Sequence, residues 1–406
     1  MKIVIIGCGA AGGTAAQFAR KVNRKAEIIL YDKEGYGQYS KCALPLVISG
    51  KDWKEIIEFS PNWFKRNGID YRNEEVYRID DGRIEAEKEE DFDKLIIATG
   101  SIAMCPFTAE NVCFLRNIED AVAIRKKALK SRKAIVVGAG LIGLEVAEAL
   151  NKMGLEVKLI EYMPYILPNM LTKDVAEYVM NFIKNFKLDI ILNCKVEKIE
   201  ENIVYTDKGE YKADFVVVAV GNKPNDYLYP NMEVNEKCMV KENIYAAGDC
   251  TIIKDFFGRK IKAGLGSIAV RQGKVAGINA AGGNEVLFPP LLSKVTKIFG
   301  LEIASTGISK ECIEAKYIGN DLPHYMNGEQ ILVKIISNEE GKILGCQAVG
   351  RGAAKIVDRI ALAIYNKMNV RDIARIENAY CPAVAPVFDA VEICCQIIEK
   401  KLKSKL

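Results

Sequence analysis

The chain has 406 residues, enough for two or three domains that each bury a core. Its 57 basic and 53 acidic residues leave a net charge of +4, which gives no reason to expect a nucleic acid or an anionic membrane as partner. No uncharged apolar run approaches the ~18 residues of a membrane span, and the four apolar residues before Cys8 are too few for a secretory signal. The 12 cysteines lack C-x-x-C spacing and His324 is the single histidine, so we expect no metal site. We expect a reduced, cytoplasmic protein whose thiols are mostly buried.

The first thirteen residues predict a dinucleotide site. An apolar strand at residues 3–6 leads into a loop with G-x-G-x-x-G spacing and then a helical segment at 14–22; the loop glycines are Gly7, Gly9 and Gly12. The first glycine permits a tight turn, the second lets backbone approach a pyrophosphate, and the third lets helix pack on strand. The acid expected to bind a ribose hydroxyl at the end of the next strand is Asp32.

A cysteine follows in a segment that favours a helix start. Pro45 is acceptable in the first helical turn, which places Cys42 near the helix N-terminus. There the helix dipole and the neighbouring Lys41 both favour thiolate over thiol. Position alone leaves open that Cys42 is a structural cysteine. Further strands are predicted at 83–86 and 93–100.

The pattern then starts again. Residues 134–143 repeat the strand and glycine loop, with Gly138, Gly140 and Gly143 in the same spacing. Glu161 ends the next strand as Asp32 ends the first, and a strand hairpin and the apolar run 214–221 complete the copy. An internal repeat carries more weight than either motif alone. The sequence therefore predicts two bound dinucleotides.

After the second copy come one more strand and helix, and the texture of the sequence changes around residues 288–290. Residues 243–249 predict a short strand ending in Gly248-Asp249, where the acid either binds hydroxyls of a bound chain or ends an ordinary turn. Residues 264–273 open a helix assigned to the first domain. After Pro290, residues 331–336 and 343–349 predict an antiparallel hairpin, and helices follow at about 352–367 and 387–402.

Together these residues resemble the FAD-dependent pyridine nucleotide–disulfide oxidoreductases. The single-cysteine branch, with CoA-disulfide reductases, NADH oxidases and NADH peroxidases, is most similar. The resemblance rests on both glycine loops, on residues 98–100 and 246–249, and on Cys42-Ala-Leu-Pro45. It implies an α/β fold with two Rossmann-like domains and a C-terminal α+β dimerisation domain, in a homodimer. The implied limits are 1–106 and 222–289 for the FAD domain, 107–221 for the NAD(P) domain, and 290–406 for the dimerisation domain.

The resemblance also assigns cofactor contacts. FAD is expected at Gly7, Gly9, Ala10, Ala11, Gly12, Asp32, Lys41, Val76, Ala98, Thr99, Gly100, Gly248, Asp249 and Ala269. NAD(P)H is expected at Gly138, Gly140, Leu141, Ile142, Gly143, Glu161 and Gly221. Glu145 is expected near the contact between nicotinamide and flavin. Because Glu161 repels a 2′-phosphate and no arginine follows it, NADH is favoured over NADPH.

By the same resemblance Cys42 is the redox cysteine. Val47 stands where a second cysteine would close an internal disulfide, so Cys42 must cycle through a mixed disulfide or a sulfenic acid. Tyr380 is expected to reach over the redox cysteine of the partner subunit, with Cys381 close by; the alternative is that Tyr380 only packs in a proline-rich turn.

Departures from the family pattern bear on the electron acceptor. Ala10 replaces the peroxidase histidine, which argues against a peroxidase, and Ala43 and Val384 depart from the CoA-disulfide reductase pattern. We therefore predict an NAD(P)H-dependent reductase of a low-molecular-weight disulfide, persulfide or polysulfide. The alternatives are an NADH oxidase, a reductase of a ferredoxin or rubredoxin, which needs no cysteine at position 42, and a non-catalytic flavoprotein sensor.

Overall fold

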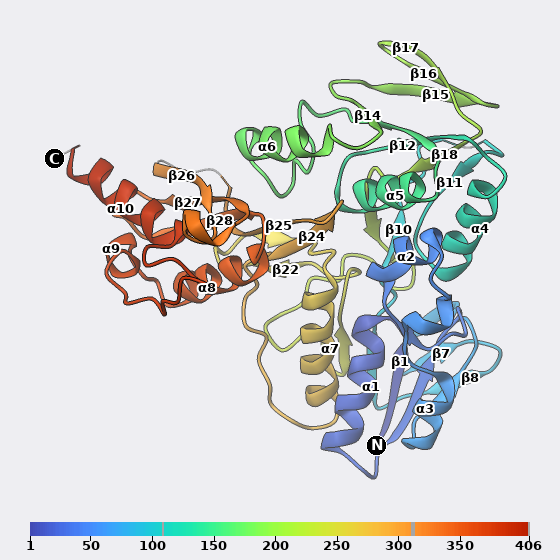
Figure 1. Cartoon of the computed structure of the whole chain (residues 1–406). Coiled ribbons are helices and arrows are strands. Elements are labelled where there is room, and N and C mark those ends of the chain that lie inside the picture. Colours follow the sequence, from blue (N-terminus) through green and yellow to red (C-terminus); the bar gives the residue numbers. More distant parts are fainter. Residues whose placement is uncertain (108, 310–312, 405–406) are drawn as a thin grey trace. The chain divides into compact units, whose positions relative to one another are not determined.

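The computed structural model describes residues 1–107, 109–309 and 313–404, which form two compact units (Figure 1). The first unit contains residues 1–106, 113–129 and 220–290. The second contains the described parts of 107–112, 130–219 and 291–404. The domain limits that the resemblance implies remain predictions.

The first unit is built on a six-stranded sheet. Its order is β20 (Met239–Lys241), β21 (Ile244–Ala246), β9 (Lys94–Ile97), β1 (Lys2–Ile6), β2 (Glu27–Tyr31) and β5 (Asp70–Arg72). All neighbours are parallel except the edge strand β20. Residues 3–6 of β1 are buried, because helices cover a parallel sheet on its faces and leave no strand side for water. The predicted strand therefore forms the centre of the sheet.

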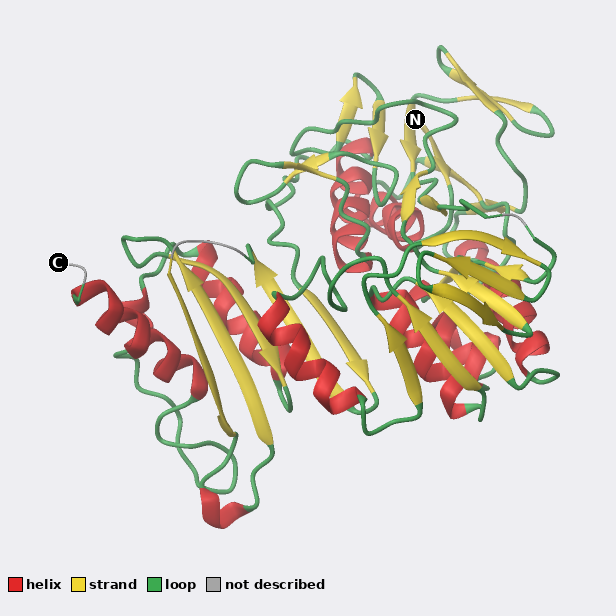
Figure 2. Ribbon diagram, turned by 90° about the horizontal axis from the view of Figure 1, so that it is seen from above, coloured by secondary structure: helices red, strands yellow, loops and turns green. Residues whose placement is uncertain are grey.

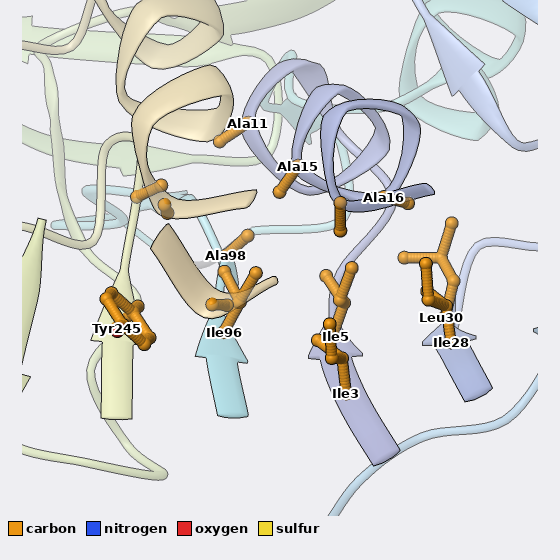
Figure 3. Close-up of a cluster of buried hydrophobic side chains, with 14 of the residues drawn as sticks. Ile3, Ile5, Ala11, Ala15, Ala16, Ile28, Leu30, Ile96, Ala98 and Tyr245 are labelled. Carbon is orange, nitrogen blue, oxygen red and sulfur yellow. The ribbon is translucent and has the colours of Figure 1, made fainter. Parts of the chain in front are cut away.

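Two helices of small residues pack side by side on this sheet. Helix α1 (Ala10–Val22) begins four residues earlier than the sequence predicts, directly after the glycine loop. It turns Ala11, Ala15 and Ala16 toward the aliphatic side chains of β1, β2 and β9 (Figure 3). Helix α7 (Gly266–Ala280) lies against α1, and a Cβ at Gly273 would stand 2.2 Å from the carbonyl oxygen of Ala11. The helix predicted at 264–273 thus belongs with the first domain's core.

Short elements complete this unit. The helices are α2 (Leu44–Ser49), α3 (Pro61–Arg66) and α4 (Ile118–Ala128), and 3₁₀ turns lie at Lys41–Ala43 and Trp53–Ile56. The strands are β3 (Gln38–Tyr39), β4 (Ile57–Phe59), β6 (Arg78–Asp80), β7 (Arg83–Glu85), β8 (Glu89–Asp91), β10 (Ser101–Ala103), β19 (Asn222–Pro224), β22 (Ile253–Lys254) and β23 (Lys260–Ile261).

The second unit repeats the parallel architecture. Four parallel strands run in the order β18 (Phe215–Val218), β12 (Lys133–Val137), β13 (Glu156–Ile160) and β14 (Leu188–Ile191). Helix α5 (Leu141–Lys152) follows β12 and packs on β12 and β13, and helix α6 is Lys173–Ile183. A three-stranded antiparallel sheet is inserted before β18: β15 (Val196–Glu200), β16 (Ile203–Thr206) and β17 (Gly209–Lys212).

The C-terminal region forms a five-stranded antiparallel sheet in the same unit. Its order is β24 (Lys294–Ile298), β25 (Leu301–Gly307), β28 (Ile343–Val349), β27 (Gln330–Ser337) and β26 (Ile313–Asn320). The predicted hairpin is β27–β28. Helices α8 (Ala353–Tyr365) and α10 (Ala390–Lys403) pack against these strands (Figure 2), and α9 is Val370–Ile373.

A row of polar residues crosses this sheet from edge to edge on one face. Pairing of the strands places five side chains in register, and we call them the polar row: Lys294, Ser305, Gln347, Lys334 and Lys316. The segment before α6 lies across them. Lys294 donates to the carbonyl of Asn169 (2.7 Å), Thr172 donates to Gln347 (3.0 Å), and Asp174 pairs with Lys334 (3.0 Å) and Lys316 (2.9 Å). The C-terminal sheet is thereby bound to the α6 segment.

No helix among the described residues is long and apolar enough to cross a membrane.

Candidate active site

The two glycine loops have the same local geometry. Gly7 and Gly138 adopt φ of +98° and +101°, a conformation that L side chains rarely take. A Cβ at Gly12 would lie 1.8 Å from the carbonyl oxygen of Gly7, and a Cβ at Gly143 would lie 1.9 Å from that of Gly138. Helix and strand therefore approach so closely in both copies that only glycine fits the third position.

Each loop leaves room for a diphosphate. A Cβ at the middle glycine, Gly9 or Gly140, would meet no described atom within 4 Å. Helices α1 and α5 begin there, at Ala10 and Leu141, with no side-chain cap and no acid in the first turn. Their N-terminal N–H groups point to the open space, where a helix N-terminus favours an anion. The residues present thus fit the diphosphate of a dinucleotide at each loop, and the assignment of FAD to the first loop and NAD(P)H to the second remains a prediction.

The first of the two predicted ribose acids is buried beside its loop. Asp32 follows β2 and is 5% exposed. Its carboxylate accepts hydrogen bonds from the hydroxyl of Tyr71 (2.5 Å) and the backbone N–H of Gly37 (3.1 Å). Burial raises the pKa of Asp32, and the Tyr71 and Gly37 bonds act in the opposite direction because they stabilise the carboxylate.

The second acid is tied to the second loop itself. Glu161 follows β13 and is buried. Its two carboxylate oxygens accept from the backbone N–H groups of Ala139 (2.5 Å) and Met163 (2.7 Å). Ala139 stands between the first two glycines of the loop, so the carboxylate is fixed beside the loop, where the sequence motif predicts a ribose.

A second polar group approaches the first glycine loop. Gly248 adopts φ +91°, and a Cβ there would stand 3.0 Å from the Cβ of Ala11. Asp249 comes next and accepts a hydrogen bond from the hydroxyl of Ser101 (2.9 Å). The strand end at Thr99-Gly100 lies beside it and is held by Asn225, whose carbonyl accepts from the Thr99 hydroxyl (2.6 Å). The predicted FAD residues Asp249, Thr99 and Gly100 are thus brought together with the first loop.

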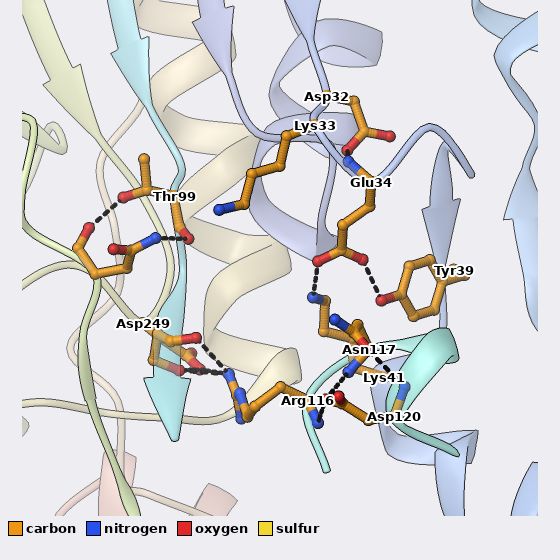
Figure 4. A network of polar contacts seen from close by, with 12 residues as sticks. Asp32, Lys33, Glu34, Tyr39, Lys41, Thr99, Arg116, Asn117, Asp120 and Asp249 are labelled. Atoms are coloured by element: carbon orange, nitrogen blue, oxygen red, sulfur yellow. Dashed lines mark hydrogen bonds and ion pairs between the residues drawn. The ribbon is translucent and has the colours of Figure 1, made fainter. Parts of the chain in front are cut away.

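Sequence reasoning missed Arg116 in this network (Figure 4). Its guanidinium donates to the hydroxyl of Ser101 (2.5 Å) and lies 3.8 Å from Asp249. Its Nε is buried without a hydrogen-bond partner among the described residues. A signal existed: Asn117 and Asp120 form a capping box that marks the start of α4 directly after Arg116.

Two other predicted FAD residues also lie in this unit. Val76 is buried, and its carbonyl accepts a hydrogen bond from the hydroxyl of Tyr227 (2.9 Å). Ala269 is buried on the first turn of α7, near Gly248. Gly221, which is predicted to contact NAD(P)H, adopts φ +112° shortly after β18. Their roles toward the cofactors remain predictions.

Cys42 is exposed at the start of a helix, as predicted. It lies in the 3₁₀ turn Lys41–Ala43, directly before α2, which has Pro45 in its first turn. A Cβ at Gly266, the first residue of α7, would stand 3.9 Å from the Cys42 sulfur. The ammonium of Lys41 pairs with Glu34 (2.8 Å), and its effect on the Cys42 thiolate remains a prediction. Because Gly266 precedes Ala269 by three residues on α7, the Cys42 sulfur lies about one helical turn from Ala269.

The other cysteines follow the predicted pattern for the most part. Only Cys105 and Cys381 are also exposed among the described cysteines. Seven are buried: Cys8, Cys194, Cys238, Cys250, Cys346, Cys394 and Cys395. No group of three or more metal-ligating side chains is found in the described part of the chain.

Tyr380 has a partner that the sequence did not indicate. It is half-exposed in the segment before α10, and a hydrogen bond to Tyr325 raises its pKa. Cys381 follows at the start of a turn closed by the N–H of Ala385, which donates to the Cys381 carbonyl (2.8 Å).

Glu145 lies on α5, two residues beyond Gly143. Its carboxylate accepts a hydrogen bond from the hydroxyl of Thr296 on β24 (2.7 Å). Burial raises the pKa of Glu145, and the Thr296 bond opposes that shift. Thr296 is a second residue that sequence reasoning missed, since nothing in the pattern of β24 singles it out.

Comparisons with known proteins agree with this geometry. The family model for pyridine nucleotide-disulphide oxidoreductases matches residues 1–295, and the model for the dimerisation domain of that family matches residues 294–390. An NADH oxidase of Methanocaldococcus jannaschii is 36% identical over 100% of both chains. A CoA-dependent NAD(P)H sulfur oxidoreductase of Pyrococcus abyssi is 32% identical over 98% of each chain.

A solved structure shows the same fold. The NAD-dependent persulfide reductase from A. fulgidus superposes with a TM-score of 0.96 at 30% identity, over 100% of this chain and 84% of that one. The predicted fold class, two dinucleotide-binding regions with a C-terminal dimerisation domain, is confirmed. The chain belongs to the pyridine nucleotide-disulphide oxidoreductase family, a family of FAD-dependent enzymes that use NAD(P)H, as its sequence predicts.

Proposed function

We propose that this protein is an NAD(P)H-dependent flavoenzyme that reduces a low-molecular-weight disulfide, persulfide or polysulfide through Cys42. The observation that carries the proposal is the position of Cys42. Its sulfur is exposed next to the first residue of α7, in the unit that holds the first glycine loop, Asp32 and Asp249.

Bound FAD supplies two-electron chemistry, taking a hydride from NAD(P)H and passing an electron pair to a disulfide. Cys42 does the sulfur chemistry. Its thiolate attacks one sulfur of the substrate disulfide, the S–S bond breaks, and the first thiol leaves as a mixed disulfide forms on Cys42. Two electrons, which bound FAD would supply, would then cleave the mixed disulfide, releasing the second half of the substrate as a thiolate and restoring the Cys42 thiolate. No second cysteine is needed, in agreement with Val47 at the position five residues on.

A CoA-linked sulfur compound is the acceptor class that we favour. Relatives that cover 98% of this chain carry the names CoA-dependent NAD(P)H sulfur oxidoreductase and NAD(P)H coenzyme A polysulfide/persulfide reductase.

Oxygen is the second candidate acceptor. The observation in its favour is the 36% identity to a relative named NADH oxidase. Both activities share the NAD(P)H half-reaction and differ only in what takes the electrons.

We also propose that the working unit is a homodimer. The dimerisation-domain model covers the segment with Tyr380, and Tyr380 and Tyr325 form an exposed pair of phenols. In a shared site Tyr380 would donate a hydrogen bond to the substrate sulfur at Cys42 of the partner.

The experiment that tests the proposal is an anaerobic and aerobic NADH-consumption screen with FAD-loaded protein. The acceptors are CoA disulfide, polysulfide with CoA, cystine and oxygen. Cys42→Ser should abolish disulfide and polysulfide turnover, while Cys105→Ser, which removes another exposed thiol of the same unit, should keep it. Full disulfide turnover by Cys42→Ser would refute the proposal, and turnover with oxygen alone would favour the oxidase.

A further inference from the structure

Thr296 joins the C-terminal sheet to the second dinucleotide-binding helix. It lies on β24, is 6% exposed, and its hydroxyl donates to Oε1 of Glu145 at 2.7 Å. Glu145 is the fifth residue of α5, so it lies about 6 Å along the helix axis from the N-terminus that faces the diphosphate. A residue of the region matched by the dimerisation-domain model thus contacts an acid beside the NAD(P)H loop.

The surroundings of Glu145 disfavour its charged form and so make the hydrogen bond from Thr296 important for that charge. Burial is the main cause that raises the pKa of Glu145, and Glu148 on the same helix adds repulsion. Glu148 is itself paired with Lys152 (2.6 Å), and on β24 the neighbouring Lys294 donates instead to the carbonyl of Asn169 (2.7 Å). The Thr296 hydroxyl is therefore the group that holds the Glu145 carboxylate in one place and favours its charged form.

We propose that Thr296 is a positioning residue for the NAD(P)H half-reaction: its hydroxyl fixes the Glu145 carboxylate in the orientation that receives the nicotinamide end of the cofactor. The inference rests on the proposed function, which requires NAD(P)H, and on the expectation from the family resemblance that Glu145 lies near the contact between nicotinamide and flavin. It extends that function by giving the C-terminal domain of the same chain a part in flavin reduction. It does not depend on the identity of the acceptor.

The test uses three variants of the FAD-loaded protein. Thr296→Val keeps the shape of the side chain and removes the hydroxyl, Thr296→Ser keeps the hydroxyl, and Glu145→Ala removes its acceptor. Anaerobic rapid mixing with NADH measures the rate of flavin bleaching from pH 6 to 9, with no disulfide present. A second readout is the titration of Glu145 in the ¹³C-carboxyl spectrum of glutamate-labelled protein, with Glu145→Ala identifying the signal.

We expect Thr296→Val to slow flavin bleaching about tenfold, the size of one hydrogen bond to a charged group. The acidic limb of its pH profile and the titration of Glu145 should both move to higher pH, since the bond that favours the carboxylate is lost. Thr296→Ser should stay within about twofold of the wild type. In the Glu145→Ala background, Thr296→Val should have no further effect, because the two residues act through one contact.

Wild-type rates and an unmoved pH profile in Thr296→Val would overturn the inference. So would an equal loss in the Glu145→Ala background, because Thr296 would then act through packing. These outcomes leave the proposed function intact, since Cys42 and the acceptors do not enter the measurement. If Thr296→Val behaves as expected but the wild-type protein turns over no sulfur acceptor, the proposed function is refuted and the inference about Thr296 stands.

Discussion

Two alanine substitutions in the first loop should separate cofactor binding from folding: Gly12→Ala should destabilise the fold, and Gly9→Ala should weaken FAD binding. A Cβ at Gly12 would stand 1.8 Å from the carbonyl oxygen of Gly7, more than 1 Å short of the 3.0 Å that real contacts keep. The neighbour is backbone in a central strand turn and cannot rotate away. Overpacking of this kind costs about 3 kcal/mol, and alanine regains about 1 kcal/mol over glycine within a helix. We expect a net loss of about 2 kcal/mol and a melting temperature about 4–8 °C lower for Gly12→Ala.

Gly9→Ala is the matched control. A Cβ at Gly9 meets no described atom within 4 Å. Alanine is a poorer N-cap than glycine by about 1 kcal/mol, but at φ −73° the lower chain entropy of alanine in the unfolded state offsets about 0.4–1 kcal/mol of that loss. The apoprotein should therefore melt within about 2 °C of the wild type. The new methyl group nevertheless fills the space through which a diphosphate reaches the N-terminus of α1, so FAD affinity should fall by about a hundredfold, equal to about 2.7 kcal/mol.

The assay is thermal unfolding of both apoproteins followed by circular dichroism, together with titration by FAD followed by quenching of flavin fluorescence. Gly9→Ala should be stable and bind FAD poorly, and Gly12→Ala should be destabilised before FAD is added. If Gly9→Ala binds FAD as tightly as the wild type, the second glycine has no role at the diphosphate. If its apoprotein melts as low as Gly12→Ala, the space above Gly9 is not open.

Four other variants test the remaining assignments. Glu161→Gln should lose most of the preference for NADH, of at least about tenfold, measured as the ratio of kcat/KM for NADH and NADPH; a wild type that uses both equally would contradict the assignment. Mixing Cys42→Ser with Tyr380→Phe chains should restore one intact site per heterodimer, and no recovery despite proven subunit exchange would mean that each chain builds its site alone. Arg116→Met should weaken FAD binding in titration and leave NADH binding unchanged, and unchanged FAD affinity would show that the guanidinium serves only Ser101 and Asp249. Asp174 has a pKa that its lysine partners and Thr172 hold below its usual range. Its contribution to the free energy of unfolding is therefore present above about pH 4 and is lost as pH falls further. Asp174→Asn should flatten the acid side of the curve of unfolding free energy against pH, and a curve identical to that of the wild type would refute this.

The parallel sheets and both loops could be predicted because their causes are local. Four consecutive buried aliphatics in β1, followed by glycines in fixed spacing, leave one way for strand, turn and helix to pack. The repeat at Gly138–Gly143 then supports the first copy. The start of α1 was placed four residues late, because Ala10 and Ala11 resemble the loop in composition although they already hydrogen-bond as helix.

The contacts that complete the candidate site depend on tertiary structure. Arg116 approaches Asp249 only because β10 and the segment before α4 lie together, and no spacing in the sequence encodes that approach. Tyr325 and Tyr380 are 55 positions apart and meet through the fold of the C-terminal region. Lys41 likewise pairs with Glu34, a contact that no pattern in the sequence indicates.

The polar row limits how this protein can be divided into fragments or have its domains exchanged. Lys334 is 2% exposed in the middle of the C-terminal sheet, and one of its two carboxylates, Asp174, is supplied by α6, far away in the sequence. Removing one partner of a fully buried ion pair costs about 3–5 kcal/mol, and the loss here is smaller because the carboxylates of Asp174 and Glu314 are 37% and 48% exposed. A C-terminal region expressed alone would bury this lysine with Glu314 only, and a chimera that exchanges the region for that of a relative would need to bring its own residues 169–174. The natural unit of exchange in this chain is therefore the sheet together with the segment that crosses it.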